Sequence, residues 1–79
     1  MSHVPRGLTA RNMARALAED GFSLVRTAGS HHIYAHDDGR VVVVPMHGGS
    51  STFPIGTLKN MIKLAQWDEE DLKRLRLIN

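Results

Sequence analysis

Apolar residues recur every three or four positions between residues 10 and 20, and this spacing predicts an amphipathic helix. Thr9 stands where its side chain can cap the free N–H groups of the first turn. Gly21 stands where a left-handed residue commonly ends a helix. The stripe predicted to face the core consists of Ala10, Met13, Ala14 and Leu17.

The next part of the chain alternates from one residue to the next, which is typical of strands with one buried face. Three short strands are expected, at residues 22–27, 31–36 and 40–44, with turns at residues 28–30 and 37–39. In the first strand the alternation places Phe22, Leu24 and Arg26 on one face and Ser23, Val25 and Thr27 on the other. In the second strand it places His31, Ile33 and Ala35 on one face and His32, Tyr34 and His36 on the other. The two hairpins predict an antiparallel three-stranded sheet.

Four consecutive valines, residues 41–44, place apolar groups on both faces of the third strand. Two helices can cover only one face of a three-stranded sheet, so something else is expected to cover the second face. The chain's own loop and a second protein are equally consistent with this pattern.

A second helical stripe follows a loop rich in Gly and Ser at residues 46–53. Pro54 suits the first turn of this helix, whose apolar positions are Leu58, Met61, Ile62 and Ala65. Asp68 is a suitable cap for a short final helix with Leu72, Leu75 and Ile78 on its apolar edge, and Trp67 is expected to fill a gap in the core. The elements predict an α+β fold, ordered helix, three-stranded antiparallel sheet, helix and short C-terminal helix.

Composition limits the classes of protein that fit this pattern. The 79 residues form a single domain, residues 1–79, near the lower size limit for a core without disulfides or metal. The absence of cysteine excludes a disulfide framework and a thiolate metal site, and it fits a reducing, cytoplasmic location. No stretch approaches the ~20 apolar residues of a membrane helix, so we expect a soluble protein without a membrane partner.

The net charge of +2 is distributed unevenly along the chain. Residues 1–67 carry seven Lys or Arg against four Asp or Glu, whereas residues 68–79 carry three against four. A mildly basic body fits a short RNA footprint, because each neutralised phosphate adds affinity through counterion release. Candidate phosphate contacts are the basic pairs one helical turn apart, Arg11 with Arg15 and Lys59 with Lys63. Glu19, one turn beyond Arg15, is expected to neutralise part of this charge.

The segment Gly29-Ser30-His31 is the strongest candidate for chemistry. A histidine at the mouth of a strand is held by the sheet behind it, and a Gly-Ser turn leaves backbone N–H groups free to meet a phosphate. Near neutral pH a histidine can take a proton from a ribose 2′-hydroxyl or give one to a leaving 5′-oxygen, without a metal. Most histidines beside strands are structural, so spacing alone does not assign catalysis to His31.

The other strand histidines are not expected to form a metal site. His32 and His36 share a strand face, but four positions along an extended chain separate them by ~13 Å. That distance is too long for one ion unless a third element folds over the strand. His32 is expected to face solvent, and we expect neither a metal nor another cofactor.

Three motifs together resemble the HicA family of toxin ribonucleases. They are Gly-Ser-His-x-x-Tyr at residues 29–34, Asp-Gly-Arg-Val-Val-Val-Val-Pro at residues 38–45, and Pro-Ile-Gly-Thr-Leu at residues 54–58. The resemblance extends from about residue 5 to about residue 72. The family often has glycine and leucine where Gln66 and Trp67 stand here, and its loop before the third motif is a residue or two shorter.

The resemblance implies a fold like that of the double-stranded-RNA-binding domain and the activity of an endoribonuclease that cleaves mRNA. It implies the toxin of a toxin–antitoxin pair, neutralised by a HicB-type antitoxin, with His31 as the catalytic residue of a metal-independent general acid–base reaction. In such a site Gly29 and Ser30 would cradle the phosphate, and Lys59 or Lys63 would offset negative charge. His47, on the loop after the third strand, is either a second participant or an ordinary surface histidine.

Two other functions remain open at this stage. A binding module without catalysis would hold RNA through four basic residues, Arg11, Arg15, Lys59 and Lys63, while His31 only supports the hairpin. A protein-interaction adaptor would have no affinity for RNA even at low salt. The nuclease differs from both because it turns RNA over, and the sequence leaves its oligomeric state open.

Overall fold

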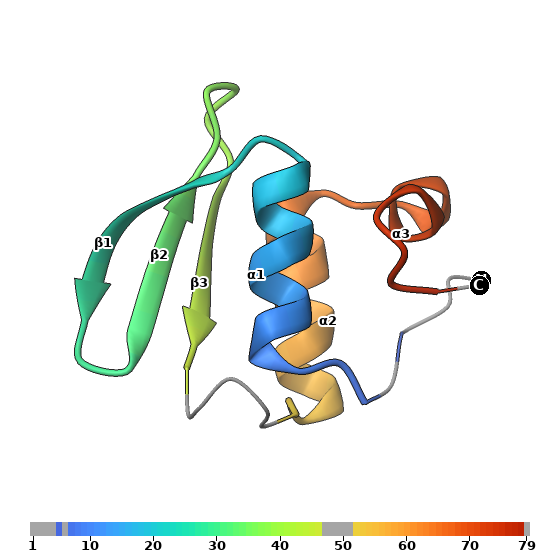
Figure 1. The fold of residues 1–79 in the computed structure, drawn as a ribbon, viewed down its shortest axis with the longest axis horizontal. Helices are drawn as coiled ribbons and strands as arrows, with labels where there is room; N and C mark the ends of the chain where they lie inside the picture. The colour runs from blue at the N-terminus through green and yellow to red at the C-terminus, as the bar shows by residue number, and fades with distance from the viewer. Residues whose placement is uncertain (1–4, 6, 47–51, 79) are drawn as a thin grey trace.

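The helices and strands follow the predicted order. The structure is a computed structural model that describes residues 5, 7–46 and 52–78. These residues contain the elements α1 (Ala10–Glu19), β1 (Ser23–Ala28), β2 (His31–Ala35), β3 (Val41–Pro45), α2 (Ile55–Ala65) and α3 (Glu69–Arg74). Both α1 and α2 pack against β3, and Figure 1 shows β1 on the edge of the sheet away from the helices. The predicted α+β class and its element order are confirmed.

The first helix begins and ends as its sequence predicts. The Oγ1 atom of Thr9 accepts a hydrogen bond from the Asn12 N–H at 3.1 Å, and Asn12 Oδ1 accepts one from the Thr9 N–H at 3.0 Å. This reciprocal cap satisfies N–H groups that the first turn leaves free. Gly21 follows the helix with a φ of +99°, which confirms the left-handed cap. Ala10, Met13 and Leu17 of the predicted stripe are buried, but Ala14 is only half-buried. Ala16, which was not predicted, is buried as well.

The strands form one antiparallel sheet in the order β1-β2-β3. Tyr34 pairs with Val42 and His32 pairs with Val44, and both valines are fully buried beneath the helices. The opposite face, which we call the open face, carries His31, Ile33 and Ala35 of β2 beside Val41, Val43 and Pro45 of β3. The predicted alternation in β2 is confirmed. The expectation that His32 faces solvent is wrong, because it shares the helix-covered face with Tyr34 and is half-buried.

The open face stays accessible over the part of the chain that the structure describes. Val41 and Val43 are 48% and 39% exposed, although both belong to the valine run that predicted a covered face. The loop that was one candidate to cover it includes residues 47–51, which lie outside the described residues.

Strand β1 departs from its predicted alternation. All six of its residues are exposed, including Leu24 at 48% and Val25 at 60%, because the helices pack at the other edge of the sheet. The register with β2 shifts between Leu24 and Arg26, which is a β-bulge at Val25. The alternation predicted through residue 27 is therefore wrong from the bulge onward. Phe22 precedes the strand and is buried in the core.

The C-terminal third confirms most of its predictions. Pro54 is the N-cap of α2, and the predicted stripe is buried at Leu58, Met61 and Ala65 and half-buried at Ile62. The helix ends at Gln66, whose φ of +59° is a conformation that favours glycine. Trp67 is buried, and Asp68 caps α3 through reciprocal hydrogen bonds with Asp71. α3 ends at Arg74, so only Leu72 of the predicted apolar edge lies within the helix. Leu72 and Leu75 are buried, and Ile78 is half-buried.

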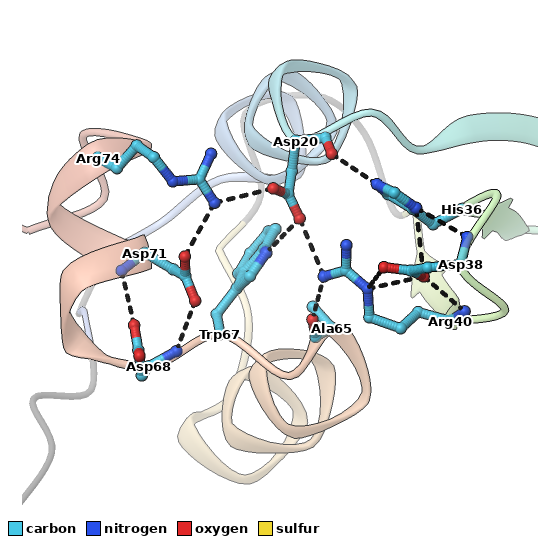
Figure 2. A network of polar contacts seen from close by, with 9 residues as sticks. All are labelled: Asp20, His36, Asp38, Arg40, Ala65, Trp67, Asp68, Asp71 and Arg74. Atoms are coloured by element: carbon cyan, nitrogen blue, oxygen red, sulfur yellow. Dashed lines mark hydrogen bonds and ion pairs between the residues drawn. The ribbon is translucent and has the colours of Figure 1, made fainter.

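A polar network joins the helices to the β2–β3 turn, as Figure 2 shows. Its centre is Asp20, the C-cap of α1, whose side chain is only 10% exposed. The carboxylate accepts hydrogen bonds from Trp67 Nε1 at 2.9 Å, Arg40 Nη1 at 3.0 Å and Arg74 Nη2 at 2.8 Å. These donors come from the α2–α3 connection, from the residue before β3 and from α3, so one carboxylate links three distant segments.

Arg40 and His36 extend this network around the turn. Arg40 donates from Nη1 to the Ala65 carbonyl at 2.6 Å and from Nε to the Asp38 carboxylate at 2.8 Å. His36 Nε2 lies 2.8 Å from the backbone carbonyl of Asp20. No buried side-chain nitrogen or oxygen of the described residues lacks a partner. Removing Asp20 would leave the Trp67 indole, which is buried, and the Arg40 guanidinium, whose side chain is 15% exposed, without this acceptor, which costs folding free energy.

The first prediction concerns the pH dependence of stability. Burial alone would raise the pKa of Asp20, but hydrogen bonds from Trp67, Arg74 and Arg40 outweigh it and hold the pKa below its ordinary value of 3.8. Such a carboxyl stabilises the fold fully above its unfolded-state pKa, and this contribution is lost as the pH falls through the lower folded-state pKa.

We expect Asp20→Asn to lower the free energy of unfolding at neutral pH by about 2–3 kcal/mol, because hydrogen bonds to a charged acceptor are lost. The difference in unfolding free energy between the variant and the parent protein should shrink as the pH falls below about 3.8. Urea unfolding at a series of pH values measures both effects. Asp37→Asn, at an exposed turn residue, is the matched control and should change stability by less than about 0.5 kcal/mol. A loss that is the same in acid as at neutral pH would contradict this role of Asp20.

The second prediction compares two glycines with similar backbone conformations. Gly21 and Gly39 have φ values of +99° and +101°. A Cβ atom on Gly21 would lie 2.9 Å from His36 Nε2, whereas one on Gly39 would meet nothing within 4 Å. Alanine at either position should cost about 1–2 kcal/mol of backbone strain. Gly21→Ala should cost more, because the imidazole of His36 must move away from Asp20. Equal losses in urea unfolding would show that this contact contributes nothing.

Candidate functional site

The two ends of the sheet differ in how their polar groups are paired. At the β2–β3 turn the network around Asp20 pairs the charged groups with one another, so we interpret that end as structural. At the other end β1 turns into β2, β3 ends, and both α1 and α2 begin (Figure 1). We call this second region the open end. It contains the predicted site residues Gly29, Ser30 and His31.

His31 is the first residue of β2, and the sheet holds its backbone on both sides. Its partners in register are Ala28 of β1 and Pro45 of β3. Its side chain belongs to the open face, and the residue is exposed. Within the described residues, no hydrogen bond or ion pair engages the imidazole. His31 thus combines a fixed backbone with a side chain that is available for proton transfer.

A tight turn precedes His31 and leaves its own backbone accessible. Gly29 has a φ of +60°, as the first central position of a type II′ hairpin turn requires. Gly29 and Ser30 are both exposed, and a Cβ atom on Gly29 would meet nothing within 4 Å. The Ser30 carbonyl accepts a hydrogen bond from the Met46 N–H at 2.6 Å. This bond places the start of the loop after β3 against the turn.

The beginnings of two helices add positive potential to the open end (Figure 1). Thr9 caps the start of α1, but Pro54 provides no side-chain cap for the start of α2. Uncapped N–H groups at a helix start carry partial positive charge, which favours a nearby anion. Thr52 pairs with Thr9 in an isolated bridge, so the segment leading into α2 lies beside the start of α1.

The lysines of α2 are exposed but are not joined to His31. Lys59 lies in the first half of α2, and Lys63 lies one turn farther from the open end. Over the described part of the chain, neither lysine forms an ion pair, and no hydrogen bond connects either one to His31. Gly29, Ser30 and His31, which are consecutive in the chain, thus lie together at the open end, and no hydrogen bond between described residues joins the two lysines to them. His47, the remaining predicted residue, lies outside the described residues.

The two arginines of α1 differ in their availability. Arg15 donates to Glu19 Oε2 at 3.2 Å and to the Leu75 carbonyl at 3.1 Å. The expectation that Glu19 neutralises part of the charge on α1 is therefore confirmed. Arg11 is exposed and has no ion pair among the described residues.

Arg26 is a residue of the open face that sequence analysis missed. Strict alternation assigned it to the face of Leu24, but the bulge places it opposite Ile33. Ile33 and His31 lie on the same face of β2, so Arg26 lies on the face of His31. Bulges are often marked by glycine or proline, but β1 contains neither residue, so no signal in the sequence predicted the shift.

Two further findings apply to the described residues alone. No three His, Cys, Asp or Glu side chains are grouped as a metal ion would require. None of the helices has the length and the apolar character needed to cross a membrane.

Comparison with known proteins identifies the family. A family model for the HicA toxin of bacterial toxin–antitoxin systems matches residues 10–67. These residues extend from the start of α1 to Trp67, so they include the whole sheet, α2 and the open end with His31. No curated protein matches the chain. Because the match covers more than half of its length, the chain belongs to the HicA family of toxins, which function in toxin–antitoxin pairs.

Proposed function

We propose that this toxin is an endoribonuclease that cleaves mRNA and that His31 is its catalytic residue. The observation that carries the proposal is the exposed imidazole of His31, fixed at the start of β2 and unpaired among the described residues. Membership of a toxin family supports an activity that harms the cell when it is not restrained. The accessible open face gives an RNA strand room to reach the imidazole.

The proposed reaction is a transesterification that needs no metal. The ribose 2′-oxygen attacks the adjacent phosphorus, the bond from phosphorus to the 5′-oxygen breaks, and the products carry a 2′,3′-cyclic phosphate and a 5′-hydroxyl. His31 either removes the proton from the 2′-hydroxyl or protonates the leaving 5′-oxygen, and such help is worth about 10²–10⁴ in rate. The other proton transfer needs a second group, for which His47 is our candidate.

Phosphate binding in this proposal uses several positive groups of the open end. The backbone of Gly29 and Ser30 is exposed beside His31, and N–H groups of such a turn bind phosphate oxygens. The uncapped start of α2 adds a favourable potential for an anion. Lys59 and Lys63 are not joined to His31, so we assign them to phosphates of flanking nucleotides.

The proposed partner is a HicB-type antitoxin that covers the open end and prevents RNA from reaching His31. The exposed valines of the open face, Val41 and Val43, are consistent with a protein partner there, because apolar surface of this kind commonly marks an interaction site. The proposed reaction takes place in the cytoplasm, where both mRNA and antitoxin are made.

A non-catalytic RNA-binding module is the second candidate function. It is favoured by Arg11, Lys59 and Lys63, which are exposed and have no ion pair within the described residues. A module of this kind would bind RNA in a salt-sensitive manner and leave it intact. Turnover therefore separates it from the nuclease.

The third prediction tests the nuclease with purified protein, RNA and EDTA. We expect the parent to cleave RNA under these conditions and His31→Ala to reduce the cleavage rate by about 10²–10⁴-fold, because the proton-transfer group is lost. His32→Ala is the matched control, since it removes the neighbouring imidazole from the helix-covered face and should cleave like the parent. Circular dichroism of both variants verifies that they are folded.

Two outcomes would contradict the proposal in different ways. If His31→Ala cleaves at the parental rate, the assignment of the catalytic residue is wrong. If the folded parent binds RNA with strong salt dependence and leaves it uncut, the protein is a binding module.

A further inference from the structure

The β-bulge in β1 determines which face Arg26 occupies. Leu24 pairs with Tyr34 and Arg26 pairs with Ile33, so two residues along β1 correspond to one step along β2. Tyr34 and Ile33 point to opposite faces of the sheet. Without the bulge, Arg26 would share the face of Leu24 on the helix side. With it, Arg26 shares the open face with His31.

The register also places Arg26 close to His31. Ala28 is directly opposite His31, and Arg26 is opposite Ile33, two residues farther along β2. Arg26 and His31 are therefore diagonal neighbours, for which the spacing is about 7–8 Å, within reach of long side chains. Ala28, the next residue of β1 on this face and the one opposite His31, carries only a methyl group.

Arg26 is also one of the few arginines without a structural role among the described residues. Four others are paired with carboxylates: Arg15 and Arg76 with Glu19, and Arg40 and Arg74 with Asp20. Arg26 is exposed, and no carboxylate of the described residues pairs with it. A guanidinium presents a planar set of N–H donors that matches two phosphate oxygens at once. Arg26 is therefore available to bind a phosphate beside the imidazole.

We propose that Arg26 binds the scissile phosphodiester of single-stranded RNA and holds it against His31. The inference rests on the proposed nuclease function and adds a substrate-binding residue to it. As the 2′-oxygen attacks, the P–O5′ bond breaks and negative charge grows on the non-bridging phosphate oxygens. The guanidinium stabilises that charge, the 2′-hydroxyl loses its proton to a base of the protein, and the 5′-oxygen receives a proton from an acid. The β-bulge places Arg26 on the face of the sheet where the scissile phosphodiester would bind.

An arginine on an uncovered edge strand has a competing structural explanation. Charged residues there discourage edge-to-edge association of sheets. Arg26→Lys separates the two roles, because lysine keeps the charge but cannot form the paired hydrogen bonds of a guanidinium. If the residue only protects the edge, Arg26→Lys should cleave like the parent, whereas a phosphate-binding residue should lose activity on this change.

The test compares cleavage by Arg26→Gln and Arg26→Lys with cleavage by Arg76→Gln. The control removes the same charge from a residue two positions after α3, and Figure 1 shows α3 on the other side of α1 and α2 from β1. We expect Arg26→Gln to reduce kcat/KM by about 10²-fold, as for loss of one donor to a transition-state oxyanion, with a smaller loss for Arg26→Lys and parental activity for Arg76→Gln. Equal activity of Arg26→Gln and Arg76→Gln would overturn the proposal.

A binding experiment locates the contact at the scissile phosphate. The probe is an RNA with a 2′-deoxy residue at the mapped cleavage link, so that it cannot be cut, made with either a normal phosphate or a neutral methylphosphonate at that link. Replacing the phosphate of the probe by the neutral methylphosphonate should weaken its binding to the parent protein but not its binding to Arg26→Gln. If both proteins lose the same factor in affinity, Arg26 does not contact that phosphate.

These results distinguish the failure of the inference from the failure of the nuclease proposal. Suppose that the parent cleaves RNA, that His31→Ala is inactive and that Arg26→Gln keeps full activity. These results would overturn only the role of Arg26. A parent that never cleaves would remove the nuclease function, and the role of Arg26 with it.

Discussion

The carboxylate of Asp20, whose side chain is only 10% exposed, is the junction on which this small fold depends. It accepts hydrogen bonds from Arg40, Trp67 and Arg74, which come from the residue before β3, the α2–α3 connection and α3. A charge at this depth is tolerated only while its partners remain in place, so the network forces the separate segments to dock together. It fixes one end of the sheet against the helices, and the proposed site residues lie at the other end.

The arrangement of the sheet explains why that other end is accessible. The helices pack against β3 and cover the face of Val42 and Val44, while β1 stays exposed along its whole length. His31 lies where the paired strands hold its backbone but no described side chain engages its ring. Stability and proposed chemistry are therefore separated in space. A toxin built this way can expose an imidazole at one end of its sheet without leaving a buried polar side chain of the described residues unpaired.

Local patterns predicted most of the fold, and long-range pairing determined the rest. The cap at Thr9, the left-handed Gly21 and the alternation of β2 depend on neighbouring residues, so they were visible in the sequence. That alternation also placed His31 on a different face from His32, although the expectation that His32 is the residue facing solvent was wrong. The bulge that redirects Arg26 depends on the register between two strands, and neither glycine nor proline marks it. The partners of Asp20 lie 20, 47 and 54 positions away, beyond any local pattern.

The chemical identity of the RNA ends produced by the purified protein tests the central claim most directly. Mass spectrometry of fragments cut in EDTA reports whether the ribose 2′-oxygen was the nucleophile. The proposed role of His31 predicts a 2′,3′-cyclic phosphate, or the monophosphate formed by its hydrolysis, on one fragment and a 5′-hydroxyl on the other. Fragments with a 3′-hydroxyl and a 5′-phosphate would contradict it, because water or a metal-bound hydroxide would then have been the nucleophile.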